Sequence, residues 1–144
     1  MADITSVQTI ADIAGVKHVS KMTNISDGTG ESLVTKIDAS ATNGMTEDAT
    51  KVLARIWYSI NTTNRNAGVE LLWGGTTNST MVVLNGQGHW DLRTFGDGIL
   101  NNATTPTGDV LLTTRNFVSG DNYTILVEFR KNCSFKLQFC INSI

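Results

Sequence analysis

The feature that most constrains this chain is how often turn-forming residues interrupt it. Clusters rich in Gly, Asn, Asp and Thr recur along the sequence, and the segments between them are short. Those segments are enriched in Val, Ile, Thr and aromatic residues, which is typical of β-strands. The expected strands are Val16–Ile25, Leu33–Ala39, Val52–Ile60, Val69–Trp73, Thr80–Leu84, His89–Phe95, Val110–Thr114 and Tyr123–Arg130.

About eight short strands separated by frequent turns predict an all-β fold, either an antiparallel β-sandwich or a jelly-roll-like barrel. A chain of 144 residues has the size of one ordinary domain and can bury a core without a metal or a disulfide. No repeat or linker divides it, so residues 1–144 are expected to form a single β domain. Residues 132–144 are expected to be a C-terminal extension, either an additional strand or an arm.

Residues 1–13 have two interpretations. They contain apolar residues at Ile4, Val7, Ile10 and Ile13 and no strong turn signal. The segment could be an arm that becomes ordered in an assembly, or it could be the first strand of the domain. The sequence does not decide between the two.

The segment from Thr46 to Ile60 fits both a helix and a strand. Thr46 could cap a helix, and apolar residues follow at helical spacing. The run "RIWYSI" is dense in β-branched and aromatic side chains, which lose rotamer freedom in a helix, so a strand is favoured. A helix, if one is present, should be short and begin near Thr46.

Alternation along the expected strands predicts which side chains form the core. Residues at every second position of a strand share one face of the sheet. The expected core consists of Val52, Ile56, Leu71, Trp73, Val83, Trp90, Leu92, Leu112, Ile125, Val127 and Phe129.

The stretch "LNGQGHWDLRTFGDG" places a histidine, two aspartates and an arginine close together. Asn85-Gly86 is a strong signal for a tight hairpin turn, which would pair Thr80–Leu84 with His89–Phe95. Alternation then puts His89, Asp91 and Arg93 along a solvated strand face, where opposite charges give weak surface support. These residues are therefore expected to be structural. His18, far away in sequence, is expected to be a strand-face or interface residue.

Composition and motifs exclude several function classes. Charged residues make up only 17% of the chain and the net charge is −2, so no basic face for nucleic acid is expected. The sequence shows no membrane span and no export signal, and it contains no catalytic or metal-binding motif. Cys133 and Cys140 lie in one extended stretch on opposite faces, which predicts two free thiols. We expect no enzymatic activity, no catalytic residue, no metal and no cofactor.

A series of phrases in a fixed order resembles small virion-associated proteins of marine tailed bacteriophages. The phrases are "KMTNISDGTGES", "RIWYSI", "VELLWGGTT", "WDLRTFGDGILNNA", "TGDVLLTT" and "DNYTILVEFRK", from about Thr23 to Lys131. The resemblance implies an all-β structural protein of the particle, with a capsid decoration or cement protein as the first expectation. The sequence departs from the family at its end, where "NCSFKLQFCINSI" runs on.

That role implies a protein made in the cytoplasm of the bacterial host and located in the virion. Its partners would be the major capsid protein or other virion proteins and further copies of itself, with no nucleic acid or membrane. The expected interface residues are Ile4, Val7 and Ile10 in the N-terminal segment, and Phe95, Ile99 and Leu100 in the loop that follows the histidine-containing stretch.

Two alternative functions remain open from the sequence. One is another station in the virion: a head-tail adaptor, a tail subunit or a fibre subunit. The other is a carbohydrate-binding β-sandwich, in which two coplanar, exposed indoles among Trp57, Trp73 and Trp90 would form a stacking platform.

Overall fold

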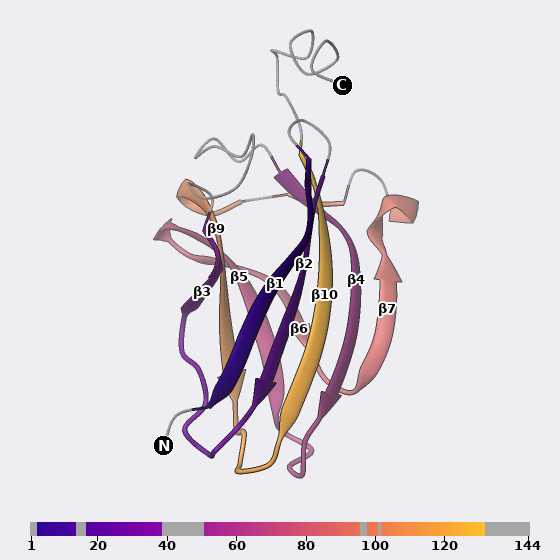
Figure 1. Cartoon of the computed structure of the whole chain (residues 1–144). Helices are drawn as coiled ribbons and strands as arrows, with labels where there is room; N and C mark the ends of the chain where they lie inside the picture. Colours follow the sequence, from indigo (N-terminus) through magenta and orange to yellow (C-terminus); the bar gives the residue numbers. More distant parts are fainter. Residues whose placement is uncertain (1–2, 14–16, 39–50, 96–97, 101, 132–144) are drawn as a thin grey trace, which may run out of the picture.

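Two antiparallel β-sheets packed face to face form the molecule in a computed structural model (Figure 1). The structure describes residues 3–13, 17–38, 51–95, 98–100 and 102–131. All strand pairs in this part of the chain are antiparallel. The all-β sandwich predicted from the sequence is therefore confirmed. Within the described residues, no helix is long and apolar enough to cross a membrane.

The larger sheet has the strand order β1-β2-β10-β4-β7, with the short strand β8 also pairing with β4. We call it sheet A. Its strands are β1 (Ile4–Ile13), β2 (Lys17–Ile25), β4 (Lys51–Asn61), β7 (Gln87–Asp91), β8 (Ile99–Leu100) and β10 (Asn122–Lys131). Residues Ile4–Ile13 of the N-terminal segment therefore form the first described strand, at one edge of sheet A.

The smaller sheet, sheet B, has the strand order β3-β9-β5-β6. Its strands are β3 (Val34–Ile37), β5 (Gly68–Thr77), β6 (Ser79–Leu84) and β9 (Thr104–Arg115). The 3-10 helix η2 (Leu92–Phe95) follows β7 and is the one helical element among the described residues. Thr46, the expected helix start, lies outside the described residues, as do both cysteines.

The core fills the space between the two sheets. Nine of the eleven residues predicted for it are buried, and eight of these, all but Val52, belong to the cluster between the sheets. These nine are Val52, Ile56, Leu71, Trp73, Leu92, Leu112, Ile125, Val127 and Phe129. Trp73 from sheet B packs against Phe129 from sheet A, with ring centroids 5.5 Å apart. Large side chains of both sheets thus interlock across the sandwich, as in the interior of other two-layer β-proteins.

The strand prediction for residues 52–60 is confirmed, and a β-bulge explains why its periodicity was ambiguous. The pairing of β4 with β10 shifts register, so that Arg55 faces Glu128 while Leu53, two positions earlier, faces Phe129. Ala54 is the extra residue, and the alternation changes phase there. Leu53 and Ile56 therefore both reach the core between the sheets. A spacing of three between core residues imitates a helical pattern.

The predicted hairpin at Asn85-Gly86 is wrong. Strand β6 pairs with β5 in sheet B, whereas β7 pairs with β4 in sheet A. The two residues thus carry the chain from one sheet to the other. Gly86 has a φ of 73°, and its carbonyl accepts a hydrogen bond of 2.7 Å from the amide of Ile60 on β4. The chain bends at Gly86, but the strands on its two sides belong to different sheets.

The core predictions for Val83 and Trp90 are wrong as well. Val83 is 63% exposed because Val82 and Leu84 face the core and Val83 points outward from sheet B. Trp90 is 44% exposed. It pairs with the core residue Ile56 and so lies on the inner side of sheet A, but on the edge strand β7, where sheet B covers it incompletely.

A pair of tryptophan substitutions tests this arrangement. Replacing the fully buried Trp73 with Ala should lower the free energy of unfolding by about 3–5 kcal/mol, the usual cost of deleting a large core aromatic. Trp90→Ala should cost roughly half of the 1.5–3 kcal/mol for complete burial of a large apolar side chain. Urea denaturation of the two variants measures both values. Equal losses would contradict the placement of the two indoles.

Three polar side chains tie the strands of sheet B together on its outer face. The Thr80 hydroxyl of β6 and the Arg115 guanidinium of β9 both donate hydrogen bonds to the carboxylate of Glu70 on β5. These donors, Thr80 first, hold the pKa of Glu70 below its ordinary value of 4.5, although burial acts in the opposite direction. The ionised form of Glu70 therefore stabilises the folded sheet.

This carboxylate should make stability depend on acid. Because the pKa of Glu70 is lower in the folded chain than in the unfolded chain, its contribution is present above about pH 4.5 and is lost as the pH falls through the folded value. Glu70→Gln should therefore lose less stability than the parent chain between about pH 7 and about pH 3. Urea denaturation at both pH values provides the measurement. An unchanged pH dependence in the variant would contradict the assignment.

Candidate interaction surface

Strand β1 offers the longest edge among the described strands at the sheet margins. It has ten residues, whereas the other edge strands, β3, β6 and β7, have four, six and five. Among the described strands β1 pairs with β2 alone, so that one side of its backbone has no described strand beside it (Figure 1). Exposed edges of this length are templates for pairing with another chain.

The apolar residues predicted for an interface on β1 are all exposed. Ile4 is 70% exposed, and Val7 and Ile10 are about half exposed. Ile4 pairs with Ile25 on the outer face of sheet A, whereas Val7 pairs with the buried Met22 and lies on the inner side. Ile10 is the extra residue of a β-bulge between Thr9 and Ala11. The strand therefore presents apolar side chains on both faces of its free edge.

Charge does little to protect this edge. Proteins often guard edge strands with lysines or other charged side chains. Between Ile4 and Ile13 the one charged residue is Asp12, whose carboxylate lies 3.6 Å from Nδ1 of His18 on β2. The bulge at Ile10 is thus the main feature that would discourage pairing along the strand.

The second predicted surface follows η2, and the structure describes part of it. Leu100 is 61% exposed, whereas Ile99 is partly buried and packs against the core. The side chain of Phe95 lies outside the described part of the chain. Strand β8 pairs Leu100 with Val52 and Ile99 with Leu53 on β4. The exposed Leu100 is thus the described side chain of this loop that is most available to a partner.

The C-terminal end of β1 and the strand β8 lie at the same end of sheet A, with other strands between them. The pairings Ile13–Lys17, Lys17–Arg130, Arg130–Val52 and Val52–Leu100 form one row across the sheet. This row joins the end of β1 to β8, with three strands between them. Ile4 lies at the other end of β1. A partner that contacts both surfaces must therefore span the width of sheet A.

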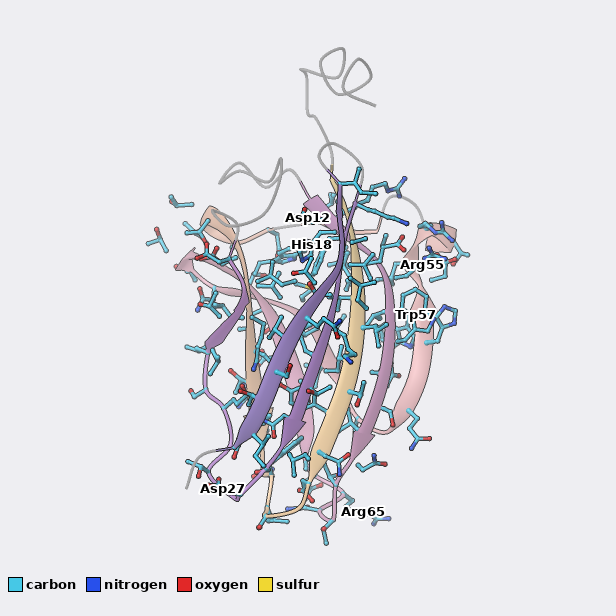
Figure 2. All side chains as sticks on the ribbon, viewed as in Figure 1. Asp12, His18, Asp27, Arg55, Trp57 and Arg65 are labelled. Carbon is cyan, nitrogen blue, oxygen red and sulfur yellow. The ribbon has the colours of Figure 1, made fainter. Side chains whose placement is uncertain are left out.

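An aromatic and charged group occupies the outer face of sheet A near β7. The rings of Trp57 and His89 are stacked with centroids 5.3 Å apart, and the Arg55 guanidinium carbon lies 5.3 Å from the Trp57 ring centroid. Arg55 also donates hydrogen bonds of 2.7 and 3.3 Å to both carboxylate oxygens of Glu128. Figure 2 shows Arg55 and Trp57 together on this side of the molecule. The sequence grouped His89 with Asp91 and Arg93, and did not foresee its stacking on Trp57.

Asp91 at the end of β7 forms an ion pair with Arg93, two residues further along the chain. Arg93 donates two hydrogen bonds to the Asp91 carboxylate, at 2.9 and 2.7 Å, and this lowers the pKa of Asp91. Both residues are at the surface, where such pairs contribute little to stability. The structural interpretation of this pair made from the sequence agrees with the geometry, although Arg93 lies in η2 and not in a strand.

The indoles do not form the stacking platform that the sequence suggested for a carbohydrate-binding β-sandwich. Trp73 is fully buried. Trp57 pairs with His89 and Trp90 pairs with Ile56, so Trp57 and Trp90 lie on opposite faces of sheet A. No two of the three tryptophans can therefore stack on one sugar surface.

His18 belongs to a buried polar group that joins β1 to β2. Its Nε2 shares a hydrogen bond of 2.6 Å with the Ser20 hydroxyl, and Asp12 lies on its other side. Figure 2 places Asp12 and His18 together near one end of the sandwich. The order aspartate, histidine, serine resembles a nucleophile relay, but the Ser20 side chain is completely buried. The strand-face expectation for His18 is confirmed, on the inner face.

Comparisons with known proteins add no relative. No protein-family model matches the chain, and no curated protein matches it.

Among the described residues, no group of three or more His, Cys, Asp or Glu side chains is arranged to hold a metal ion.

Two glycines test how tightly the loop around β8 is held. A Cβ on Gly98 (φ 106°) would lie 2.4 Å from the Leu53 carbonyl oxygen, whereas one on Gly86 (φ 73°) would meet nothing within 4 Å. Gly86→Ala should cost about 1–2 kcal/mol for the left-handed backbone alone. Gly98→Ala should cost more, because the loop must also move away from β4. Thermal unfolding compares them, and equal melting temperatures would contradict the close approach of the loop.

Proposed function

We propose that this chain is a non-enzymatic structural protein of a tailed-bacteriophage virion, a capsid decoration or cement protein that binds the head surface. The observation that carries the proposal is the long edge strand β1, with Ile4, Val7 and Ile10 exposed along it. The ordered resemblance to virion-associated phage proteins supports the same role. The protein would be made in the host cytoplasm and act in the particle.

The binding mode that fits β1 is strand addition. An edge strand supplies backbone N–H and C=O groups to a partner strand, and flanking apolar side chains add contact area. The partner would be an extended segment of the major capsid protein or of another virion protein. The exposed Leu100 on β8 provides a second contact, to a neighbouring virion protein or another copy of the chain. Copies would be arranged symmetrically on the particle, where multivalency makes modest contacts sufficient.

Such contacts should depend little on ionic strength. Backbone pairing and apolar burial do not rest on long-range attraction between charges, which a Debye length of about 8 Å at physiological ionic strength would screen. The only charged side chain of β1, Asp12, already faces His18 within the chain. Binding through this edge is therefore expected to persist in high salt.

A rebinding experiment tests the role of β1. The purified chain is added to virions from which the native protein has been removed, and bound chain is measured after sedimentation. The triple variant Ile4→Ser, Val7→Thr, Ile10→Ser should bind at least about tenfold more weakly, since loss of one large buried apolar side chain costs about 1.5–3 kcal/mol. Val83→Thr is the control, because Val83 is also an exposed apolar residue but lies on sheet B.

The outcomes separate the parts of the proposal. Full binding by the triple variant would exclude β1 as the interface, and failure of the parent chain to bind heads would exclude the cement role. A cryo-EM map of the particle distinguishes a head decoration protein from a head-tail adaptor, a tail subunit or a fibre subunit by its position and copy number.

A further inference from the structure

A buried polar cluster connects the two sheets and plays no part in the proposed surface. It consists of Asn24 on β2, Lys36 on β3, Tyr123 on β10 and Glu31 in the segment between β2 and β3. Each of the four residues is at least nine-tenths buried. The cluster lies toward the end of the sandwich where Asp27 is labelled in Figure 2, because the Asp3 carboxylate contacts both Asn24 and the Asp27 amide.

The carboxylate of Glu31 is the centre of this cluster. One of its oxygens, Oε2, contacts the Lys36 ammonium. The other, Oε1, accepts hydrogen bonds from Asn24 Nδ2 at 2.8 Å and from the Tyr123 hydroxyl at 2.6 Å. The amine of Lys36 and the side-chain amide of Asn24 therefore meet at one carboxylate, in an interior from which water is largely excluded.

The surrounding strands hold these groups in place. Asn24 and Tyr123 are direct cross-strand partners in sheet A. The backbone of Glu31 is fixed by β9, since its amide donates to the Thr114 hydroxyl at 2.8 Å and its carbonyl accepts from the Thr114 amide at 3.0 Å. Lys36 is the residue at which the register between β3 and β9 shifts, and its side chain is buried.

We propose that Lys36 and Asn24 form an intramolecular amide bond between sheet B and sheet A, with Glu31 as the residue that transfers the proton. A lysine amine that is desolvated in the protein interior can act as an uncharged nucleophile. Here that amine contacts the same carboxylate as the Asn24 amide. Holding the Lys36 amine and the Asn24 amide in one site supplies the proximity that attack of an amine on an amide needs. The bond is independent of the role in the virion.

The reaction balances without a cofactor or an oxidant. Glu31 accepts a proton from the Lys36 ammonium, which removes two opposite charges from the interior and leaves a neutral amine. Nζ of Lys36 then forms a bond to Cγ of Asn24. One hydrogen of Nζ passes by way of Glu31 to Nδ2, the Cγ–Nδ2 bond breaks, and ammonia leaves. On its release the ammonia takes up the proton that Lys36 first gave, so the products are the amide and ammonium.

Two further features of Asn24 are consistent with this reaction. Asp3 accepts a second hydrogen bond, of 3.0 Å, from Nδ2 of Asn24, so that two carboxylates face the nitrogen that must leave as ammonia. Among the described residues, Asn24 Oδ1 has no hydrogen-bond partner. A protonated Glu31 is a donor next to this amide and can polarise its carbonyl. Buried polar atoms without partners are rare and call for an explanation.

Peptide mapping gives a direct test, because Met22–Lys36 is a single tryptic peptide and the next cleavage site is Lys51. Trypsin does not cut after a lysine whose amine is in an amide. Digestion of the denatured wild-type chain should therefore yield a peptide of residues 22–51 that is lighter by one ammonia. Tandem mass spectrometry should show no fragmentation between the two linked residues.

Two variants serve as controls. Lys36→Arg keeps the charge beside Glu31 but should not form the bond, so that digestion gives residues 22–36 at full mass. Glu31→Gln keeps both reacting groups and should give the same result, because it removes the proton acceptor.

The outcomes are decisive even if a variant does not fold. A wild-type peptide at full mass, before and after prolonged incubation of the intact chain, would overturn the proposal. Loss of ammonia that persists in Lys36→Arg would also overturn it, since it would indicate closure of Asn24 on its own backbone.

Discussion

The two sheets of this sandwich meet around the carboxylate of Glu31. That group contacts β2 and β10 in sheet A through Asn24 and Tyr123, and β3 in sheet B through Lys36, while the Glu31 backbone is bonded to β9. A charge in a protein interior is costly unless it is paired and hydrogen-bonded, so these partners must arrive together. The pairing of β3 with β9 and of β2 with β10 brings them there. One polar junction thereby fixes how the sheets lie on each other at this end.

The sequence predicted the fold class because its local signals were consistent. Turn clusters delimited most strands, and burial alternates regularly along β2, which is continuous in its pairing with β10. The errors fall where a tertiary feature changed the phase or the partner of a strand. Val82 and Val83 are identical neighbours, so alternation alone does not say which one faces the core. Asn85-Gly86 has the chemistry of a hairpin turn, but the strand after it joins the other sheet.

The candidate surfaces were partly visible in the sequence. The apolar positions of the N-terminal segment predicted a strand or arm with Ile4, Val7 and Ile10, and their exposure follows from the edge position of β1. The polar junction at Glu31 was not visible. Asn24, Glu31 and Lys36 lie in and around a turn-rich stretch, where polar residues are ordinarily solvated. Their burial depends on contacts of the Glu31 carboxylate with side chains from three different strands, and short-range patterns do not contain that information.

The polar junction and the exposed edge are coupled through β2. This strand is the template for β1, and polar contacts secure β1 at both ends: Asp3 contacts Asn24 near the start, and Asp12 contacts His18 near the end. Nδ2 of Asn24 donates hydrogen bonds to both Asp3 and Glu31. The start of β1 is therefore linked, through two carboxylates, to the polar junction between the sheets. A partner strand paired with β1 would transmit mechanical force to these hydrogen bonds of Asn24. An amide bond between Asn24 and Lys36 would carry that load into sheet B through a covalent path, so that force on the edge would not separate the sheets at their polar end.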